Sequence, residues 1–246
     1  MILQEKKFII EDENENWPLE KYYFVQKYIT PDSIVLDAAC GTGFGSMLLA
    51  QKAKKVVAID IDEPSIKRAR ASFSKDNLNF LEADVKKTTF PDDYFDVIVS
   101  IETIEHLTEA DQALFLQELK RVLKKEGVLI ISTPDKEVAL AQGFCYGDFH
   151  EKEFNKEEFL ELLKSYFNKV ELFGQGPFVK LSWGRKVLNF LKKIDVFKIR
   201  KLSLLKKYTK KIDRFTSPVK FDYSLYPMKE SEPDQGAIHL IGICRN

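Results

Sequence analysis

The stretch IVLDAACGTGFGS, residues 34–46, decides the fold. It opens with an apolar run and continues through Gly41 and Gly43 directly into an amphipathic run at 44–53. Glycines let the backbone pass close to a ligand, and the first turn of a helix offers free N–H groups to it. The stretch therefore predicts a strand, a ligand-binding loop and a helix, in that order.

Outward from this stretch, short β-branched runs alternate with longer amphipathic ones. Such alternation indicates βαβ units and a parallel sheet whose strands are apolar on both faces. We predict an α/β fold with a Rossmann-like, doubly wound, mostly parallel seven-stranded sheet, helices on both faces and an antiparallel C-terminal strand. The last two strands are expected to form a hairpin at one edge. The predicted strands are 34–40, 55–61, 77–84, 95–102, 126–134, 168–175 and 236–245, and the predicted helices are 44–53, 64–73, 109–125 and 155–167.

The length of 246 residues permits one large α/β domain with additions. We divide the chain into an N-terminal helical cap (1–33), a core (34–179), a basic helical lid insert (180–235) and a final core strand (236–246).

Composition excludes several classes of protein. Hydrophobic residues make up 44% and charged residues 31% of the chain, as in soluble globular proteins. No apolar run approaches the roughly 18 residues that span a bilayer. Three cysteines without CxxC spacing suggest neither disulfides nor a cysteine metal site. We expect a cytoplasmic protein.

The segment 180–215 is strongly basic, with thirteen Lys or Arg residues against two Asp. Apolar residues recur in it at near-helical spacing, which favours surface helices that form a lid over a binding site. Alternatively, a basic amphipathic helix can lie on the anionic inner face of a membrane and so reach a lipid-linked intermediate, or it can follow a phosphate backbone. The sequence contains no recognisable RNA-binding module, so nucleic acid is not expected as a partner. Nothing in the sequence indicates the oligomeric state.

Acidic residues end the first three predicted strands. Asp60 lies nineteen residues after Gly41, the distance at which an acid can hold ribose hydroxyls, and Asp84 ends the third strand. Position 46, where an NAD fingerprint has its third glycine, is Ser46. A nucleotide-like cofactor other than NAD is indicated. The plainer alternative is that the glycines make a turn and the acids solvate strand ends.

At these motifs the sequence resembles the class I S-adenosylmethionine-dependent methyltransferases. The resemblance implies that the glycine loop approaches the methionine part of the cofactor, that Asp60 binds the ribose and that Asp84 meets the adenine. Many members have glycine where this chain has Ala39. The implied cofactor-binding residues are Asp37, Ala39, Gly41, Gly43, Asp60, Ile61, Asp84, Val85 and Ile101.

A second motif, ETIEH, follows the fourth predicted strand. If a helical turn begins there, Glu102, Glu105 and His106 stand at i, i+3 and i+4 and share one face. His150, in GDFHEKEF, is the expected fourth member. Carboxylates favour magnesium or manganese, and imidazole extends the choice toward iron, nickel or zinc. We predict these four residues as a divalent-metal site.

Two alternatives stay open for this motif. Without a metal, His106 or His150 is a general base oriented by a glutamate such as Glu105. In a purely structural role, Glu105 would favour a helix N-terminus and His106 would cap a packed helix. His239 is expected to be a packed histidine, and Tyr22 either lines the acceptor pocket or packs on the core.

The combination of ETIEHL, STPD and FHEKEF resembles a metal-assisted subgroup, above all bacterial O-methyltransferases of type 11 or 12 associated with surface glycans. The resemblance implies methyl transfer from S-adenosylmethionine to a hydroxyl of a sugar or glycan, assisted by magnesium or manganese. The alternatives are an O-methyltransferase of a small aromatic or quinone precursor, an RNA 2′-O-methyltransferase and a non-catalytic cofactor sensor.

Overall fold

The structure, a computed structural model, describes residues 17–142, 150–176, 179–180, 225–229 and 235–246. Its strands are β1 (Ile34–Ala38), β2 (Lys55–Asp60), β3 (Leu78–Glu82), β4 (Phe95–Ile101), β5 (Leu123–Pro134), β6 (Lys169–Gln175), β7 (Val179–Lys180), β8 (Leu225–Pro227), β9 (Gln235–Gly236) and β10 (His239–Arg245). Its helices are α1 (Trp17–Val25), α2 (Phe44–Leu49), α3 (Glu63–Ser72), α4 (Glu109–Val122), α5 (Lys136–Gln142) and α6 (Lys156–Tyr166), with short 3₁₀ turns η2 (Gln26–Tyr28) and η3 (Ile104–His106).

The main sheet has the order β3-β2-β1-β4-β5-β10-β6-β8. Strands β1 to β5 pair in parallel, and β10 runs antiparallel to both β5 and β6. The Rossmann-like, mostly parallel sheet with an antiparallel C-terminal strand is confirmed. The count of seven strands is wrong, because β8 adds an eighth at the edge next to β6. The last strand also does not end an edge hairpin, since β10 lies between β5 and β6.

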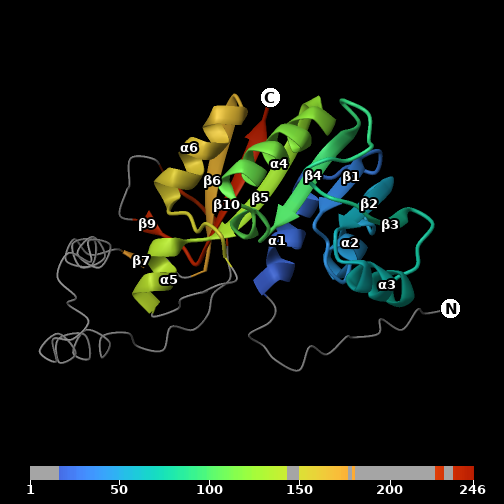
Figure 1. The fold of residues 1–246 in the computed structure, drawn as a ribbon, viewed down its shortest axis with the longest axis horizontal. Helices are drawn as coiled ribbons and strands as arrows, with labels where there is room; N and C mark the ends of the chain where they lie inside the picture. Colours follow the sequence, from blue (N-terminus) through green and yellow to red (C-terminus); the bar gives the residue numbers. More distant parts are fainter. Residues whose placement is uncertain (1–16, 143–149, 177–178, 181–224, 230–234) are drawn as a thin grey trace, which may run out of the picture.

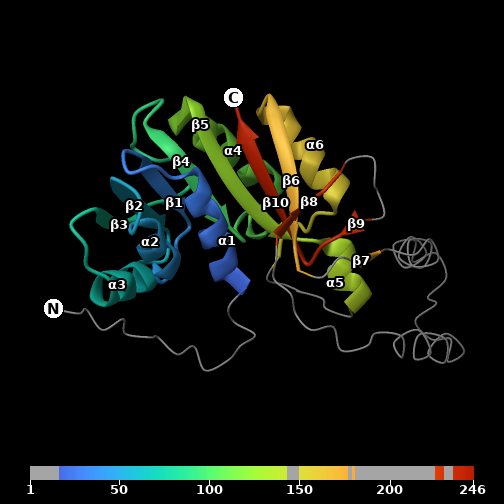
Figure 2. The same cartoon turned by 180° about the vertical axis from the view of Figure 1, so that it is seen from behind.

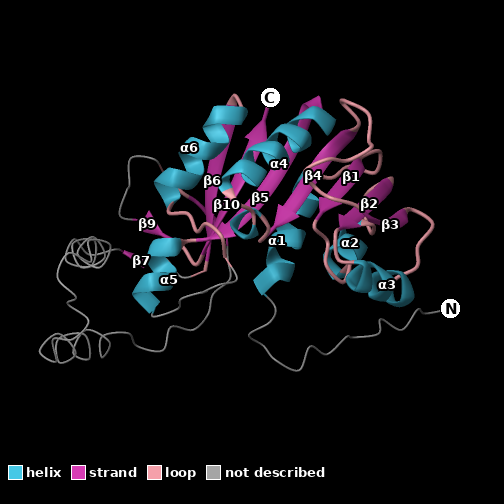
Figure 3. Ribbon diagram, viewed as in Figure 1, coloured by secondary structure: helices cyan, strands magenta, loops and turns pink. Residues whose placement is uncertain are grey.

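Helices cover both faces of the sheet (Figures 1, 2 and 3). Helices α4 and α6 lie on the face turned to the viewer in Figure 1, and α1 lies on the opposite face, seen in Figure 2. Two apolar layers follow from this arrangement. One joins α4 and α6 to the sheet, and the other joins α1 and α2 to it.

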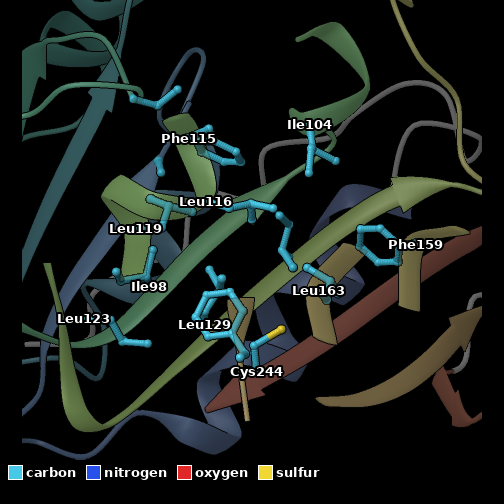
Figure 4. Close-up of a cluster of buried hydrophobic side chains, with 14 of the residues drawn as sticks. Ile98, Ile104, Phe115, Leu116, Leu119, Leu123, Leu129, Phe159, Leu163 and Cys244 are labelled. Atoms are coloured by element: carbon cyan, nitrogen blue, oxygen red, sulfur yellow. The ribbon is translucent and has the colours of Figure 1, made fainter. Parts of the chain in front are cut away.

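The larger core lies under α4 and α6 (Figure 4). Phe115, Leu116 and Leu119 form the apolar stripe of α4, and all three are fully buried. Each such side chain stabilises the fold by about 1.5–3 kcal/mol relative to an exposed position. Phe159 and Leu163 of α6 meet the same layer. This packing fixes α4 and the strand ends that precede it.

Helix α6 begins with the expected capping box at Asn155. The Asn155 side chain accepts a hydrogen bond from the Glu158 N–H at 2.8 Å, and the Glu158 carboxylate accepts one from the Asn155 N–H at 3.1 Å. Two otherwise orphaned donors are thereby satisfied, which sets the start of the helix just after the segment that carries His150.

Short strands lie at or near the two ends of the predicted lid insert (180–235). Strand β7 pairs with β9, and residues 225–227 form β8 of the main sheet although our division of the chain put them in the insert. The rest of the predicted lid, at 181–224 and 230–234, lies outside the described residues. Among the described helices, none is both long and apolar enough to cross a membrane.

Candidate active site

The loop after β1 has an unusual backbone. Ala39, Gly41 and Gly43 all have positive φ values, of 68°, 53° and 81°. Glycine takes this left-handed conformation without cost, whereas an alanine does so at a cost of roughly 1–2 kcal/mol. Ala39 therefore adopts, at some strain, a backbone that glycine takes more readily.

The three glycines of the loop serve different purposes. A Cβ placed on Gly43 would lie 2.5 Å from the Phe80 ring, and one on Gly45 would lie 2.0 Å from the Tyr22 ring. These two positions are therefore required for packing. A Cβ on Gly41 would have no atom within 4 Å among the described residues. Gly41 faces open space, where a ligand can approach the backbone.

Asp37 supports the loop from inside the protein. It has no exposed surface, and it accepts hydrogen bonds from Ser46 Oγ at 2.6 Å and Tyr22 Oη at 3.3 Å. Burial raises the pKa of Asp37 to about 7, and the two hydroxyl donors oppose part of that rise. Tyr22 therefore packs in the core, as one of the two predictions had it. Asp37 therefore supports the loop from inside the protein, and its carboxylate is not exposed to a ligand.

Asp60 joins the loop to the end of β2. Its Oδ2 accepts a hydrogen bond from the Gly41 N–H at 2.7 Å, and its Oδ1 accepts one from the Asp62 N–H at 2.9 Å. The neighbouring Ile61 is 69% exposed, although it is a large apolar residue. A carboxylate beside an exposed apolar side chain suits a ligand that combines hydroxyl groups with an apolar ring.

Asp84 follows β3 at the same edge of the sheet. Its Oδ1 accepts the Lys86 N–H at 2.9 Å, and Lys86 Nζ lies 3.8 Å from Oδ2. Val85, which follows Asp84, and Ile101, which ends β4, are both buried. The predicted cofactor residues therefore lie at the carboxyl ends of β1, β2, β3 and β4, which are neighbours in the sheet.

The structure brings three of the four predicted metal ligands together. Glu105, His106 and His150 each offer one ligand atom, and these atoms lie within 4.8 Å of one another. The His106 and His150 rings meet edge to face, with centroids 4.9 Å apart. Glu105 is buried, His150 is partly buried and His106 is exposed. We call these three residues the Glu–His–His cluster.

Backbone hydrogen bonds hold His150 at this cluster. The N–H groups of Glu151 and Lys152 both donate to the Glu105 carbonyl, at 2.9 and 3.1 Å. On the other side, Gln112 of α4 donates to the carbonyls of Ile104 and Leu107 and so pins η3. The segment after residue 149 is therefore tied directly to the turn that carries Glu105.

Glu102 does not join the cluster, and the prediction of a shared helical turn is wrong. Glu102 has φ 52°, so the chain leaves β4 in a left-handed conformation and only η3 is helical. Its Oε1 accepts from Lys21 Nζ and from Ser132 Oγ, both at 2.6 Å, and His239 Nε2 lies 3.6 Å from Oε2. Glu102 thus pairs with the Lys21 ammonium group and does not join the predicted metal ligands Glu105, His106 and His150.

The charges of the two glutamates differ sharply. Burial raises the pKa of Glu105 to about 8, and the negative charge of Glu102 adds to the rise. Burial also opposes ionisation of Glu102, but Lys21, His239 and Ser132 together outweigh it and lower the pKa of Glu102. Burial lowers the pKa of His150, and so does the neighbouring His106, while Glu153 opposes both. A negative Glu105 is therefore costly unless a cation or a proton accompanies it.

This donor set fits a divalent cation. Among the described residues, no group donates a well-formed hydrogen bond to either carboxylate oxygen of Glu105. One carboxylate and two imidazoles form a ligand set that suits manganese, iron, nickel or zinc, and magnesium less well. Glu105, His106 and His150 would hold such an ion, and Glu102 would not.

A cavity of about 530 Å³ opens beside His150. No Phe, Tyr or Trp among the described residues lines it. Its lining consists of Thr108, Glu109, Lys136, His150, Glu151, Lys152, Glu153 and Glu158. The space next to the cluster is therefore polar, with many hydrogen-bonding groups.

Sequence reasoning missed Lys21, Ser132 and Glu153. Glu153 Oε1 lies 3.5 Å from His150 Nδ1, where it can orient the ring. Lys21 carried only a weak signal, the apolar Trp17, Phe24 and Val25 at helical spacing from it, and the structure shows that it is 1% exposed. Ser132 carried none, since a serine in a buried strand has many possible partners.

The fold and these strand ends define a Rossmann-like domain that binds a nucleotide-type cofactor at the carboxyl edge of its sheet. Residues 36–131 match the sequence family described as a methyltransferase domain. The matched part of the chain is similar to the class I S-adenosylmethionine-dependent methyltransferases.

Three similar proteins illustrate the relationship. A probable S-adenosylmethionine-dependent methyltransferase of Mycobacterium tuberculosis is 33% identical over 61% of this chain and 54% of its own length. The ubiquinone biosynthesis O-methyltransferase of Rickettsia akari is 32% identical over 47% of this chain and 46% of its own. A crystal structure of an S-adenosylmethionine-dependent methyltransferase from Archaeoglobus fulgidus shares the fold, with a TM-score of 0.62, 18% identity and 94% coverage of both chains. The chain spans about half the length of the curated relatives it matches.

Proposed function

We propose that this protein transfers a methyl group from S-adenosylmethionine to a hydroxyl oxygen of a sugar or glycan. The observation that carries the proposal is the convergence of Glu105, His106 and His150 within 4.8 Å just after β4. Strand β4 pairs with β1, whose end carries the glycine loop. The turn that carries Glu105 and His106 therefore follows the strand next to the one that leads into the glycine loop, which supports a role beside the cofactor.

The residues that would hold the cofactor follow from their positions. Gly41 leaves its backbone accessible, Asp60 offers a carboxylate to ribose hydroxyls, and exposed Ile61 offers an apolar surface to the adenine. Asp84, half exposed after β3, is the candidate for the adenine amino group. When bound, S-adenosylmethionine supplies an electrophilic methyl group on a positively charged sulfur.

The chain has to position the acceptor hydroxyl and take up its proton. Glu153 lies 3.5 Å from His150 Nδ1 and favours the tautomer with the proton on that nitrogen, which leaves Nε2 able to accept one. His106, in contact with the same ring, can share this task. A divalent ion such as manganese or magnesium on Glu105, His106 and His150 would lower the pKa of a coordinated hydroxyl.

The polar cavity beside His150 supports a sugar as the acceptor. Its described lining offers carboxylates, ammonium groups and a hydroxyl, which match a polyol, and no aromatic surface on which a flat ring would stack. The acceptor class rests on this match, together with the resemblance to glycan-associated enzymes.

A second candidate is a small aromatic or quinone precursor. The similarity to the ubiquinone biosynthesis O-methyltransferase of Rickettsia akari favours it. A catechol, with two adjacent hydroxyls, would also suit a metal on the Glu–His–His cluster. RNA and a purely cofactor-binding role have no such observation in their favour.

The proposed partner of segment 180–215 is an anionic membrane surface or a lipid-linked glycan. Its support is the basic amphipathic sequence alone. Binding of the full chain to vesicles with and without anionic lipid tests it, and equal binding to both would remove the proposal.

The function is tested by methyl transfer to a panel of nucleotide-sugars, lipid-linked glycans, catechols and short RNAs, with and without chelator. We expect turnover on a glycan, lost with chelator and restored by manganese or magnesium. Turnover that a chelator leaves unchanged would rule out a role for a metal, and His106 or His150 would then be the general base. Turnover on catechols alone would establish the second candidate.

A further inference from the structure

Two consecutive residues of α1 reach carboxylates at the ends of two different strands. Lys21 Nζ lies 2.6 Å from Glu102 Oε1 at the end of β4, and Tyr22 Oη lies 3.3 Å from Asp37 Oδ1 near the end of β1. The first contact is at the turn that leads to the Glu–His–His cluster, and the second is beneath the glycine loop. One helix thus contacts both halves of the candidate active site.

Lys21 contacts a residue whose backbone is strained. Glu102 has φ 52°, a conformation that costs a non-glycine residue energy and persists only where its surroundings enforce it. The Glu102 N–H is held by the carbonyl and the hydroxyl of Ser132, both at 3.2 Å. Its carboxylate is held by Lys21 and Ser132. Backbone and side chain are both restrained.

The direction of the chain after β4 depends on this residue. Glu102 is followed by Thr103 and then η3, which carries Glu105 and His106. A change in the Glu102 backbone would therefore rotate the turn and move these two side chains relative to His150. Contacts that hold the Glu102 backbone therefore also hold the Glu105 and His106 side chains in position.

Burying the Lys21–Glu102 ion pair in the core costs free energy. Lys21 is 1% exposed, and burial lowers its pKa although Glu102 and Glu105 both oppose that change. A buried ion pair is seldom more stable than apolar residues of similar volume. A lysine at this position therefore calls for a reason other than stability. Orientation of Glu102 provides one.

We propose that Lys21 is a positioning residue for methyl transfer: by holding the left-handed Glu102 turn, it sets Glu105 and His106 against His150. This inference rests on the proposed function, in which the cluster activates the acceptor. It assigns to α1 a role in the acceptor half of the site through Lys21 and in the cofactor half through Tyr22.

The experiment compares three variants of the full chain: Lys21→Met, the double variant Lys21→Met with Glu102→Gln, and Tyr22→Phe. The double variant removes both charges and guards against a fold lost to one unpaired buried charge. Affinity for S-adenosylmethionine is measured by calorimetry, and methyl transfer with the acceptor found in the panel. We expect the Lys21 variants to keep cofactor affinity within about threefold and to lose about 100-fold in kcat. For Tyr22→Phe we expect weaker cofactor binding, by about tenfold, with a smaller change in kcat.

A second readout needs no acceptor. The chain has three histidines, so the imidazole proton NMR signals of His106, His150 and His239 can each be assigned. In the double variant the signals of His106 and His150 should shift, and in Tyr22→Phe they should stay. A double variant that regains stability, turnover and the parent His106 and His150 signals would overturn the inference. A parent without turnover on any acceptor would instead count against the proposed function, while the NMR comparison would still decide the role of Lys21.

Discussion

The Gly41 N–H donates a hydrogen bond to the Asp60 carboxylate over 2.7 Å, and this bond ties the loop after β1 to the end of β2. Of the loop's three glycines, the one held by this bond is the one at which an added Cβ would meet no described atom within 4 Å. A carboxylate has about four acceptor positions, so Asp60 can hold the loop and still receive ligand hydroxyls.

Asp60→Ala should weaken S-adenosylmethionine binding by about 10- to 100-fold, because the hydrogen bonds from the Gly41 and Asp62 N–H groups and those to the ligand are lost together. Calorimetric titration measures the change. The matched control is Asp62→Asn two residues away, which retains an oxygen to cap α3 at Ser65 and should leave affinity unchanged. Equal losses in both variants would argue against a ligand role for Asp60.

Gly41→Ala and Gly45→Ala should separate binding from folding. A Cβ at Gly45 would lie 2.0 Å from the Tyr22 ring, so we expect a loss of about 1–3 kcal/mol in the free energy of unfolding. At Gly41 the added methyl meets no described atom, and we expect a loss of about 1 kcal/mol from its positive φ together with weaker cofactor binding. Urea denaturation and calorimetry report the two effects. Strong cofactor binding by Gly41→Ala would contradict this assignment.

Glu118 provides a pH-dependent contribution to stability. Arg121 lowers the pKa of Glu118 to about 2, burial opposes this, and Thr88 donates two further hydrogen bonds. Because the folded pKa is depressed, the contribution is fully present above the unfolded value near 4.5 and is lost as the pH falls toward 2. Glu118→Gln should therefore cost about 2 kcal/mol at pH 7 and progressively less below pH 4.5.

Urea denaturation of Glu118→Gln between pH 7 and pH 2 checks this expectation, with Glu161→Gln on the exposed face of α6 as the control. A cost that stays constant with pH would show that the charge of Glu118 is irrelevant.

Manganese binding should depend on Glu105 and on neither Glu102 nor the cavity carboxylates. Glu105→Gln removes the only carboxylate of the cluster, and we expect it to lower manganese affinity by at least about tenfold. Electron paramagnetic resonance of free manganese measures the affinity. Glu109→Gln, an exposed carboxylate on the same cavity, should leave it unchanged. If both variants bind manganese like the parent, the cluster is not a metal site.

Much of the fold could be predicted, because it depends on local patterns. The apolar runs, the glycine loop and the capping box at Asn155 each act within a few residues, and the structure reproduces them. The place of β10 between β5 and β6 was not predictable from these patterns. It depends on which exposed strand edge the last strand meets, and hydrophobic periodicity carries no information on that.

The candidate site was predicted less completely, for a similar reason. Helical spacing grouped Glu102 with Glu105 and His106, but the left-handed backbone at Glu102 breaks that spacing. The conformation is imposed by Lys21 and Ser132, which are distant in sequence. His150 was correctly expected near Glu105, and the backbone bonds that bring it there involve the following residues Glu151 and Lys152. Local spacing identified the side chains but not their partners.

In the proposed function, the Glu–His–His cluster activates an acceptor hydroxyl beside a bound cofactor. Single-turnover methyl transfer at saturating S-adenosylmethionine, compared between the parent and Glu105→Gln, tests it most directly. We predict a rate lower by about 100-fold in Glu105→Gln with cofactor affinity within threefold of the parent. Equal rates in the two proteins would contradict the account.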